Sequence, residues 1–393
     1  MKIHTRAVHA GDRKPAGAHV ASTTPIHTAT SYFYESTEQL DRVFGEEEKG
    51  YCYARYDNPS TAALEELMCS LEGGQSALAC ASGMAALHTA ILTALTDRRR
   101  SIVAAHALYG QTVSLLMNVL EPAGIAVRFA DVCDPAAFRS AVEEARPGCI
   151  LMETISNPLV RVGPLDSIAA MAAEAGAALV VDNTFATPLL ARPLELGAAF
   201  TVHSLSKYLA GHGDVLGGVV VTNAAHAATL RALGRNVGPT LGPFECYLAM
   251  RGIKTFPLRM ERQCANAAAV AARLAQHPRV ERVYFGGNPS HPDAATIQRL
   301  FPAGLYGAIV AFDLRGAATA EVFRFMDALK MIVRATSLGD VHSMMLYPAM
   351  SSHRELSPKH RQRLGIGGNL VRLSVGIEDP EDICADLEQG LAR

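Results

Sequence analysis

Short apolar runs alternate with amphipathic segments through the middle of the chain. Apolar runs typical of buried strands lie at Ile102–Ala105, Ala126–Phe129, Ile150–Glu153, Ala178–Asp182 and Val219–Thr222. Helical spacing of apolar residues precedes them at Ala62–Leu71 and Gly83–Leu95. Strands without polar alternation, separated by helices, are typical of a sheet covered on both faces. The pattern therefore predicts an α/β fold with a mostly parallel sheet.

The two ends of the chain follow other patterns. Residues 1–60 are rich in polar residues, Pro and Gly and show little helical period, which predicts an extended arm that wraps another surface. A long helix is predicted over Glu245–Ala275, followed by strands near Val283–Phe285, Gly307–Asp313 and Val371–Val375. We therefore expect an arm (1–60), a large domain (61–245) and a smaller α+β domain (246–393).

Composition and charge narrow the class of protein. The 393 residues are 49% hydrophobic, enough to bury a large core, and the formal net charge is -2 without a long basic block. Nucleic-acid and membrane-surface binding are therefore not indicated. No signal-peptide core or long apolar span is present, so we expect a cytoplasmic protein. The eight cysteines have no C-x-x-C spacing, which predicts free thiols and no zinc site.

A lysine after two small hydroxyl residues is the most informative chemical feature. Ser204 and Ser206 precede Lys207, and the apolar run upstream ends in Asp182. A lysine amine can bind the aldehyde of pyridoxal phosphate (PLP), and a carboxylate can keep the pyridine nitrogen protonated, so that the ring accepts electrons. Either residue alone is commonly a solvated loop lysine or a helix cap. Their combination predicts a PLP site with both serines facing the phosphate.

Two turns before helices carry further candidate groups. The small residues Ala79–Ala86 include Ser82, Gly83 and Met84 at a helix start, where free backbone N–H groups favour a phosphate. Tyr109 lies on a turn between a strand and a helix, where its ring can stack on a planar cofactor and its phenol can transfer a proton. A packing tyrosine is the alternative.

Two arginines are candidates for anion binding. Arg55 lies in the aromatic segment Tyr51–Pro59 of the arm, and its guanidinium suits phosphate oxygens. Arg372 lies inside an apolar strand, where an unpaired charge is unfavourable. A substrate carboxylate or an internal salt bridge would satisfy it.

These segments together resemble the Cys/Met-metabolism PLP-dependent enzymes, the transsulfuration group. The resemblance runs nearly end to end, through Tyr51–Pro59, Ser82-Gly83-Met84, Tyr109-Gly110, Asp182-Asn183-Thr184, Ser204–Tyr208, Gly211–Asp214, Arg251–Thr255, Ser337-Leu338-Gly339 and Leu370–Asp379. It implies a fold type I PLP enzyme, built as a homotetramer of dimers in which the arm enters the neighbour's active site.

The resemblance also implies roles for single residues. Lys207 is similar to the cofactor-binding lysine, Asp182 to the partner of the pyridine nitrogen, Tyr109 to the ring-stacking tyrosine, and Asn157 to the residue near the phenolic oxygen. The phosphate site would comprise Ser82, Gly83, Met84, Ser204 and Ser206, with Tyr53 and Arg55 from the adjacent subunit. Arg372, helped by Ser337, would bind the substrate's α-carboxylate.

Four positions depart from the group's pattern and bear on substrate. Relatives that hold cystathionine have charged residues where this chain has Cys52, Ser114 and Thr336, and methionine γ-lyases often have cysteine where it has Gln111. The resemblance therefore implies a γ-elimination on a methionine-like or polar γ-substituted amino acid, with 2-oxobutanoate and ammonia as products. γ-Replacement by a sulfhydrylase or synthase, a canavanine γ-lyase, and a PLP-bound regulatory protein are the alternatives.

Overall fold

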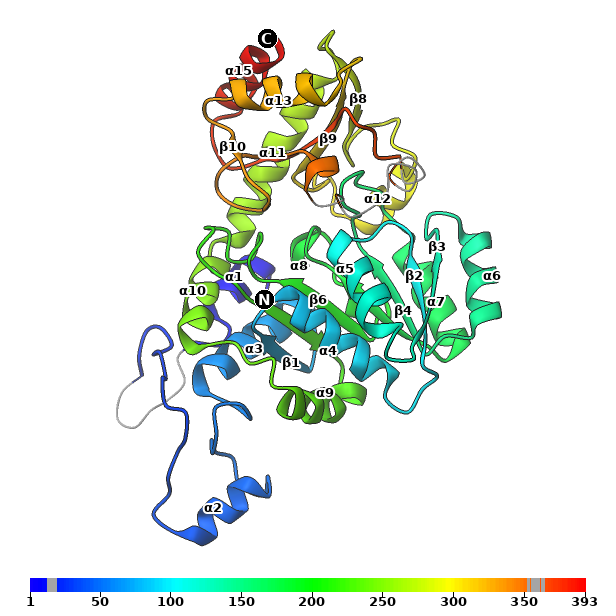
Figure 1. The fold of residues 1–393 in the computed structure, drawn as a ribbon. Helices are drawn as coiled ribbons and strands as arrows, with labels where there is room; N and C mark the ends of the chain where they lie inside the picture. Colours follow the sequence, from blue (N-terminus) through cyan, green and yellow to red (C-terminus); the bar gives the residue numbers. More distant parts are fainter. Residues whose placement is uncertain (13–19, 352–353, 355–360, 362–364) are drawn as a thin grey trace.

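A seven-stranded sheet forms the centre of the larger part of the molecule in this computed structural model (Figure 1), which describes residues 1–12, 20–351, 354, 361 and 365–393. Its strands are β1 (Ser76–Cys80), β2 (Ser101–Ala105), β3 (Ala126–Ala130), β4 (Cys149–Glu153), β5 (Ala178–Asp182), β6 (Phe200–Ser204) and β7 (Gly218–Thr222). The spatial order is β1-β7-β6-β5-β4-β2-β3, and only β7 runs antiparallel to its neighbours. The predicted α/β class is confirmed.

Helices cover both faces of this sheet because its strands are apolar on both sides. They are α3 (Pro59–Glu72), α4 (Gly83–Leu95), α5 (Gly110–Leu115) with the π-helix η1 (Leu116–Leu120), α6 (Pro135–Ala145), α7 (Leu165–Ala175), α8 (Thr187–Leu190), the 3-10 helix η2 (Pro193–Leu196) and α9 (Ala224–Val237). Strand β7 shows the alternation directly: Val220 packs in one core with α4, whereas Val219 and Val221 pack in a second core with α3.

A second, mostly antiparallel sheet forms the smaller part at the top of Figure 1. Its order is β10 (Val333–Arg334), β11 (Met344–Leu346), β12 (Leu370–Ser374), β9 (Ile309–Leu314) and β8 (Val280–Tyr284). The helices around it are α12 (Ala294–Leu300), α13 (Thr319–Ala328), the 3-10 turn η3 (Pro348–Met350) and α15 (Pro380–Leu391). Phe312, Val371 and Ile383 are buried in its core.

The single long helix predicted over Glu245–Ala275 is two helices in the structure. α10 spans Pro243–Ile253, and α11 spans Phe256–Leu274 and runs up into the smaller part (Figure 1). Pro257 explains the break, because it has no N–H to donate and its ring clashes with the carbonyl of Ile253 in a continuous helix. Arg259 stabilises the junction between α10 and α11, because its guanidinium donates to the carbonyls of Tyr208, Leu209 and Gly252 at 2.7–3.0 Å.

The first 60 residues are more helical than their composition predicts. α1 (Ile3–His9) packs against α3 and α11, so the start of the chain lies on the body. α2 (Thr37–Phe44) begins at Ser36, whose side chain accepts a hydrogen bond from the N–H of Gln39. Figure 1 shows α2 at the tip of a segment that stands away from the rest of the molecule. None of the helices in the described ranges is long and apolar enough to cross a bilayer.

Candidate active site

A cavity of about 440 Å³ opens where β4, β5 and β6 end, at Glu153, Asp182 and Ser204. Ligands of open α/β sheets bind at the carboxyl ends of the strands, so this is the expected place for a site. The predicted residues that line the cavity are Ser82, Gly83, Met84, Tyr109, Gln111, Asn157, Asp182, Ser204, Ser206, Lys207, Thr336 and Arg372. Segments more than 280 residues apart in sequence therefore meet around one space.

Lys207 lies on the turn that follows β6, with its amine directed at the smaller domain. Its Nζ donates a 2.9 Å hydrogen bond to Oγ of Ser337. Burial, assisted by the positive charge of Arg372, lowers the pKa of Lys207 from 10.5 to about 8. A neutral amine is therefore accessible near physiological pH, which a nucleophile or proton acceptor requires.

The segment around Ser337 fits closely against the turn that carries Lys207. Gly339 has a φ of +75°, and a Cβ there would lie 2.5 Å from the backbone nitrogen of Tyr208. Its N–H donates to Oγ of Ser374 at 2.8 Å. Only glycine combines this backbone conformation with so close an approach, and the fit sets the position of Ser337 relative to the amine.

Asp182 ends β5 at the base of the cavity. Its Oδ1 accepts a hydrogen bond of 3.0 Å from the N–H of Thr184. Burial raises the pKa of Asp182, and the hydrogen bonds from Thr184 and the charge of His203 oppose that rise. A cationic partner, such as a protonated pyridine nitrogen, would relieve the remaining cost of the buried carboxylate.

The start of α4 is arranged to hold an anion. The hydroxyl of Ser82 accepts a hydrogen bond of 3.1 Å from the N–H of Ala85, so the N–H groups of Gly83 and Met84 remain without an acceptor inside the helix. A Cβ on Gly83 would lie 2.9 Å from Cβ of Ser204, which shows how closely the helix start meets the end of β6. Together with the hydroxyls of Ser204 and Ser206, these groups form a phosphate-sized set of donors.

Tyr109 immediately precedes α5, and its backbone is held by Glu153, which was not predicted from the sequence. Its backbone N–H donates to Oε1 of Glu153 at 2.5 Å, while its side chain borders the cavity. Burial, with the nearby charge of Asp182, raises the pKa of Glu153 well above the usual range. Burial also raises the pKa of the Tyr109 phenol, and the charge of Arg372 opposes that rise. The phenol is therefore neutral at physiological pH and can donate a proton.

Arg372 lies on β12 and is only 2% exposed. Its Nη1 donates to Oδ1 of Asn157 and its Nη2 to the carbonyl of Ser337, both at 2.9 Å. Within the described ranges no carboxylate lies within ion-pair distance of this guanidinium, and its buried Nε has no protein acceptor. Burial lowers its pKa to about 10, so it remains cationic. The internal salt bridge considered as an alternative is absent from the described residues, and an anionic ligand fits the site.

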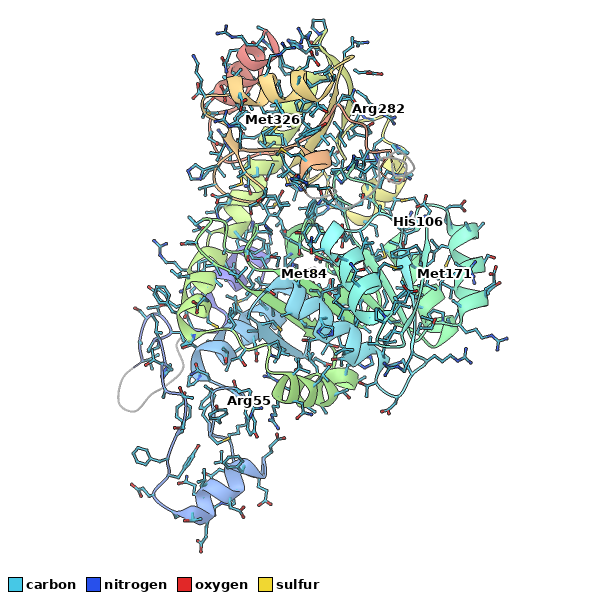
Figure 2. The ribbon with its side chains drawn as sticks, viewed as in Figure 1. Arg55, Met84, His106, Met171, Arg282 and Met326 are labelled. Atoms are coloured by element: carbon cyan, nitrogen blue, oxygen red, sulfur yellow. The ribbon has the colours of Figure 1, made fainter. Side chains whose placement is uncertain are left out.

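The predicted arm residues do not lie at this cavity. Arg55 donates to the carbonyl of Arg235 on α9 and stacks on Tyr56, with its Cζ 5.0 Å from the ring centroid. Figure 2 shows Arg55 low in the molecule, well separated from Met84 at the start of α4. Tyr53 bridges to Ser31 within the arm, and Cys52 lines a separate hollow beside α2. Ser114 lies on α5, where its Oγ accepts a hydrogen bond from Asn118.

Several lining residues were not predicted from the sequence: Glu153, Ile155, Thr184, Phe185, Leu216, Leu338 and Ser351. Glu153, Thr184 and Phe185 lie at or just after the ends of β4 and β5, so the strand-end rule that identified Asp182 could have found them. Leu216 and Ser351 come from loops, and no local pattern marks them.

The cavity fits PLP on the chemistry of its walls. An amine, a carboxylate and a set of phosphate donors lie around one space of suitable size, and Arg372 adds a buried cation beside it. In the part of the chain that the structure describes, no cluster of three or more His, Cys, Asp or Glu residues is arranged to hold a metal ion.

Comparison with known proteins agrees with this geometry. The family described as Cys/Met metabolism PLP-dependent enzyme matches residues 4–392. The chain is 38% identical to an L-methionine gamma-lyase of Fusobacterium nucleatum subsp. polymorphum, covering 100% of this chain and 98% of that protein. It is 37% identical to the O-succinylhomoserine sulfhydrylase of Pseudomonas aeruginosa, covering 99% and 94%. The crystal structure of cystathionine gamma-lyase from Lactobacillus plantarum, complexed with L-serine, superimposes with a TM-score of 0.92 at 34% identity, covering 100% and 99%.

Proposed function

The chain belongs to the Cys/Met metabolism PLP-dependent enzymes, and from that premise we propose that it eliminates the γ-substituent of a compact L-amino acid, with 2-oxobutanoate and ammonia as products. The enzyme uses PLP, and both γ-elimination and γ-replacement occur among its named relatives. The observation that carries the proposal is the buried Arg372, a cation without a carboxylate partner in the described residues, beside the amine of Lys207.

Bound PLP supplies an electron sink for charge that develops on the substrate when a proton leaves its α-carbon. Lys207 is the residue we assign to binding the cofactor and to accepting that proton. Its pKa of about 8 leaves part of the amine neutral at physiological pH. Asp182 would pair with the ring nitrogen, and Asn157 would face the ring's phenolic oxygen. Ser82, Gly83, Met84, Ser204 and Ser206 would hold the phosphate.

Arg372 and Ser337 would orient the substrate. The guanidinium is oriented by Asn157 and by the carbonyl of Ser337, and its remaining N–H donors are available for a carboxylate. Binding the α-carboxylate there places the α-carbon close to Lys207, because Ser337 itself contacts the lysine amine. The same amine can then move a proton at the α-carbon or the β-carbon without a second base.

Tyr109 is the residue we assign to the departure of the γ-substituent. Its neutral phenol can stack on the ring and donate a proton to the leaving group. The lining of the cavity includes the uncharged residues Gln111, Thr336 and Ser351. These side chains favour a compact, uncharged or hydrogen-bonding γ-substituent over a second zwitterionic amino-acid group.

The active assembly we propose is a homotetramer in the cytoplasm, in which the arm of one chain completes the phosphate site of another. Arg55 and Tyr53 do not line the cavity of their own chain, and they belong to the arm, whose part around α2 stands away from the body (Figure 1). Phe33 on this segment is 95% exposed, which supports its burial against a partner. All eight cysteines are free thiols, as expected for a reducing compartment.

The relative named as a sulfhydrylase favours a second candidate, γ-replacement. After the leaving group departs, the four-carbon fragment is either hydrolysed to 2-oxobutanoate and ammonia or captured by a nucleophile at the γ-carbon. Access of a thiol or sulfide to the cavity decides between these outcomes.

A panel of γ-substituted amino acids, assayed with and without sulfide or cysteine, tests the proposal. We expect 2-oxobutanoate and ammonia from at least one compact substrate without an added nucleophile, and no product with the Lys207→Ala variant. Turnover only when sulfide or cysteine is added, without 2-oxobutanoate, would replace elimination by γ-replacement. Absence of both products would overturn the proposed function.

A further inference from the structure

A cluster of buried polar side chains lies behind the cavity without contributing to its lining. Glu72, at the end of α3, and His203, on β6, are both 0% exposed, and Nε2 of His203 lies 2.5 Å from Oε1 of Glu72. Asn183, which follows Asp182, is also 0% exposed and donates to the same Oε1 at 3.0 Å. None of the three lines the cavity. The proposed function leaves this cluster without a role.

The hydrogen bonds of Asn183 fix the orientation of its amide beside Glu72. Nδ2 of Asn183 donates to the carbonyl of Ala191 at 2.8 Å, and its Oδ1 accepts from the hydroxyl of Thr154 at 2.7 Å. A carbonyl can only accept, so the amide nitrogen is the atom that faces Oε1 of Glu72, and Oε1 accepts from it. Nδ1 of His203 and Oε2 of Glu72 are buried without a hydrogen-bond partner among the described residues, so the contact between Nε2 and Oε1 is the polar contact that joins the two side chains.

This cluster lies directly beneath the residues that face the cofactor. Successive residues of a strand point to opposite faces, and Ser204 lines the cavity, so His203 points to the other face, toward Glu72. Asp182 pairs with Val202 on the neighbouring strand, one residue before His203. Burial raises the pKa of Asp182, and the hydrogen bonds from Thr184 and the charge of His203 oppose that rise.

A second carboxyl, that of Glu153, lies beside Asp182. Glu153 and Asp182 are register partners on β4 and β5, and both line the cavity. Two neighbouring buried carboxyls do not both ionise readily, and burial with the charge of Asp182 raises the pKa of Glu153. A cation behind the sheet beside Asp182 would decide which of the two carries the negative charge. On the cavity side, the charges that face this pair are those of Lys207 and Arg372.

We propose that Glu72 holds His203 as a cation behind the sheet, and that this charge keeps Asp182, not Glu153, ionised for the ring nitrogen of PLP. Glu72 and His203 are positioning residues, since they act through Asp182 and do not touch the cofactor. The proposal rests on the role given to Asp182 in the proposed function. The buried Glu72–His203 pair would therefore determine which of the two neighbouring carboxyls, Asp182 or Glu153, is ionised.

The test compares binding of two ligands to the full-length protein after its cofactor has been removed. One ligand is PLP, and the other is the analogue in which the ring nitrogen is replaced by C–H. The variants Glu72→Gln and His203→Gln keep the size and a polar end of each side chain and remove the charge. We expect each to weaken PLP binding about tenfold. Binding of the analogue should change less than about twofold, because it has no nitrogen for Asp182 to bind.

Two controls separate the possible failures. Asp386→Asn removes another buried carboxylate, which accepts hydrogen bonds from the N–H groups of residues 330–332 in the smaller domain, and should leave both ligands' affinities unchanged. In an Asp182→Asn background, Glu72→Gln should have no further effect on PLP. Equal losses of affinity for PLP and the analogue, or no loss for either, would overturn the proposal that the Glu72–His203 pair keeps Asp182 ionised. If Asp182→Asn itself fails to discriminate between the two ligands, the role of Asp182 in the proposed function is wrong instead.

Discussion

The guanidinium of Arg372 donates from Nη1 to the side-chain oxygen of Asn157 at 2.9 Å, and this bond joins the smaller domain to the larger one. Arg372 lies on β12, whereas Asn157 follows β4. Asn157 is proposed to face the cofactor ring, so the bond fixes the direction of the carboxylate-binding group relative to that ring. A displacement of either domain would alter the distance between the substrate's α-carbon and Lys207.

Replacement of Arg372 should impair substrate binding far more than cofactor binding. A charged hydrogen bond contributes about 1.5–3 kcal/mol, so we expect kcat/KM to fall about 100-fold in Arg372→Gln. Arg372→Lys should recover only part of the loss, because lysine lacks the planar pair of donors. Arg282→Gln, at an exposed position of the smaller domain, is the matched control. A PLP dissociation constant that rises as much as kcat/KM falls would contradict a role in binding the carboxylate.

The reactivity of Lys207 should follow a low pKa. In cofactor-free protein, the labelling of Lys207 by PLP and borohydride, mapped by peptide mass spectrometry, should rise with pH and level off above about 8 instead of near 10.5. Because Arg372 contributes to this depression, Arg372→Gln should move the midpoint upward. Below pH 8 the protonated Lys207 lowers the free energy of unfolding, because burial disfavours the charged amine. This destabilisation disappears as the pH rises from 8 to 10.5, whereas a lysine stabilised by a salt bridge would lose stability as the pH rises. A midpoint unmoved from 10.5 would contradict this environment.

Much of the larger domain could be predicted because buried parallel strands appear as continuous apolar runs. The predicted strand Ala178–Asp182 is β5 itself, and its last residue was correctly placed at a strand end. β6 was not predicted, since Phe200–Ser204 contains three polar residues and is not a continuous apolar run. The break at Pro257 was missed because apolar periodicity continues across it. In the proposed assembly the arm contacts a second chain, and no pattern within one sequence gives the positions of such contacts.

Arg259 should be a major contributor to stability at the joint between α10 and α11. Its guanidinium is buried and donates to three backbone carbonyls, including those of the two residues that follow Lys207. Arg259→Gln leaves these carbonyls unpaired, so its free energy of unfolding, measured by urea denaturation, should be lower by about 1–3 kcal/mol. Arg299→Gln removes an exposed ion pair with Asp166 and should cost under about 1 kcal/mol. Equal losses in the two variants would show that the joint does not depend on Arg259.

Sharing of active sites between subunits predicts complementation. Arg55→Ala and Arg372→Ala should each be nearly inactive, because one removes a proposed phosphate ligand and the other the carboxylate ligand. After subunits are dissociated, mixed and reassembled, one kind of site in the hybrid would contain both arginines, and activity should partly return. Each variant mixed with itself is the control. No recovery despite mass-spectrometric proof of hybrids would mean that Arg55 and Arg372 of a single chain serve the same site, or that Arg55 serves no active site.

Substrate preference should follow from the uncharged side chains at the four positions that depart from the group's pattern. Gln111 and Thr336 line the cavity, whereas Cys52 and Ser114 lie outside the lining of their own chain's cavity, and none of these four residues carries a formal charge. A distal amino-acid group would lose hydration without gaining an opposite charge, at about 1–3 kcal/mol for each unpaired polar group. Cystathionine should therefore be a poor substrate. A compact γ-substituent that accepts a hydrogen bond from the Gln111 amide should react faster.

Steady-state rates with cystathionine, methionine, O-acetylhomoserine and canavanine measure this preference. Gln111→Ala should lower kcat/KM about tenfold for the preferred polar substrate, as expected for loss of one hydrogen bond, and should change methionine turnover much less. Asn118→Ala, on the exposed side of η1, is a control for disturbance of the helix. If cystathionine had the highest kcat/KM of the four, a charged group from a partner's arm would have to complete the pocket, and the uncharged Gln111 and Thr336 would not set the specificity.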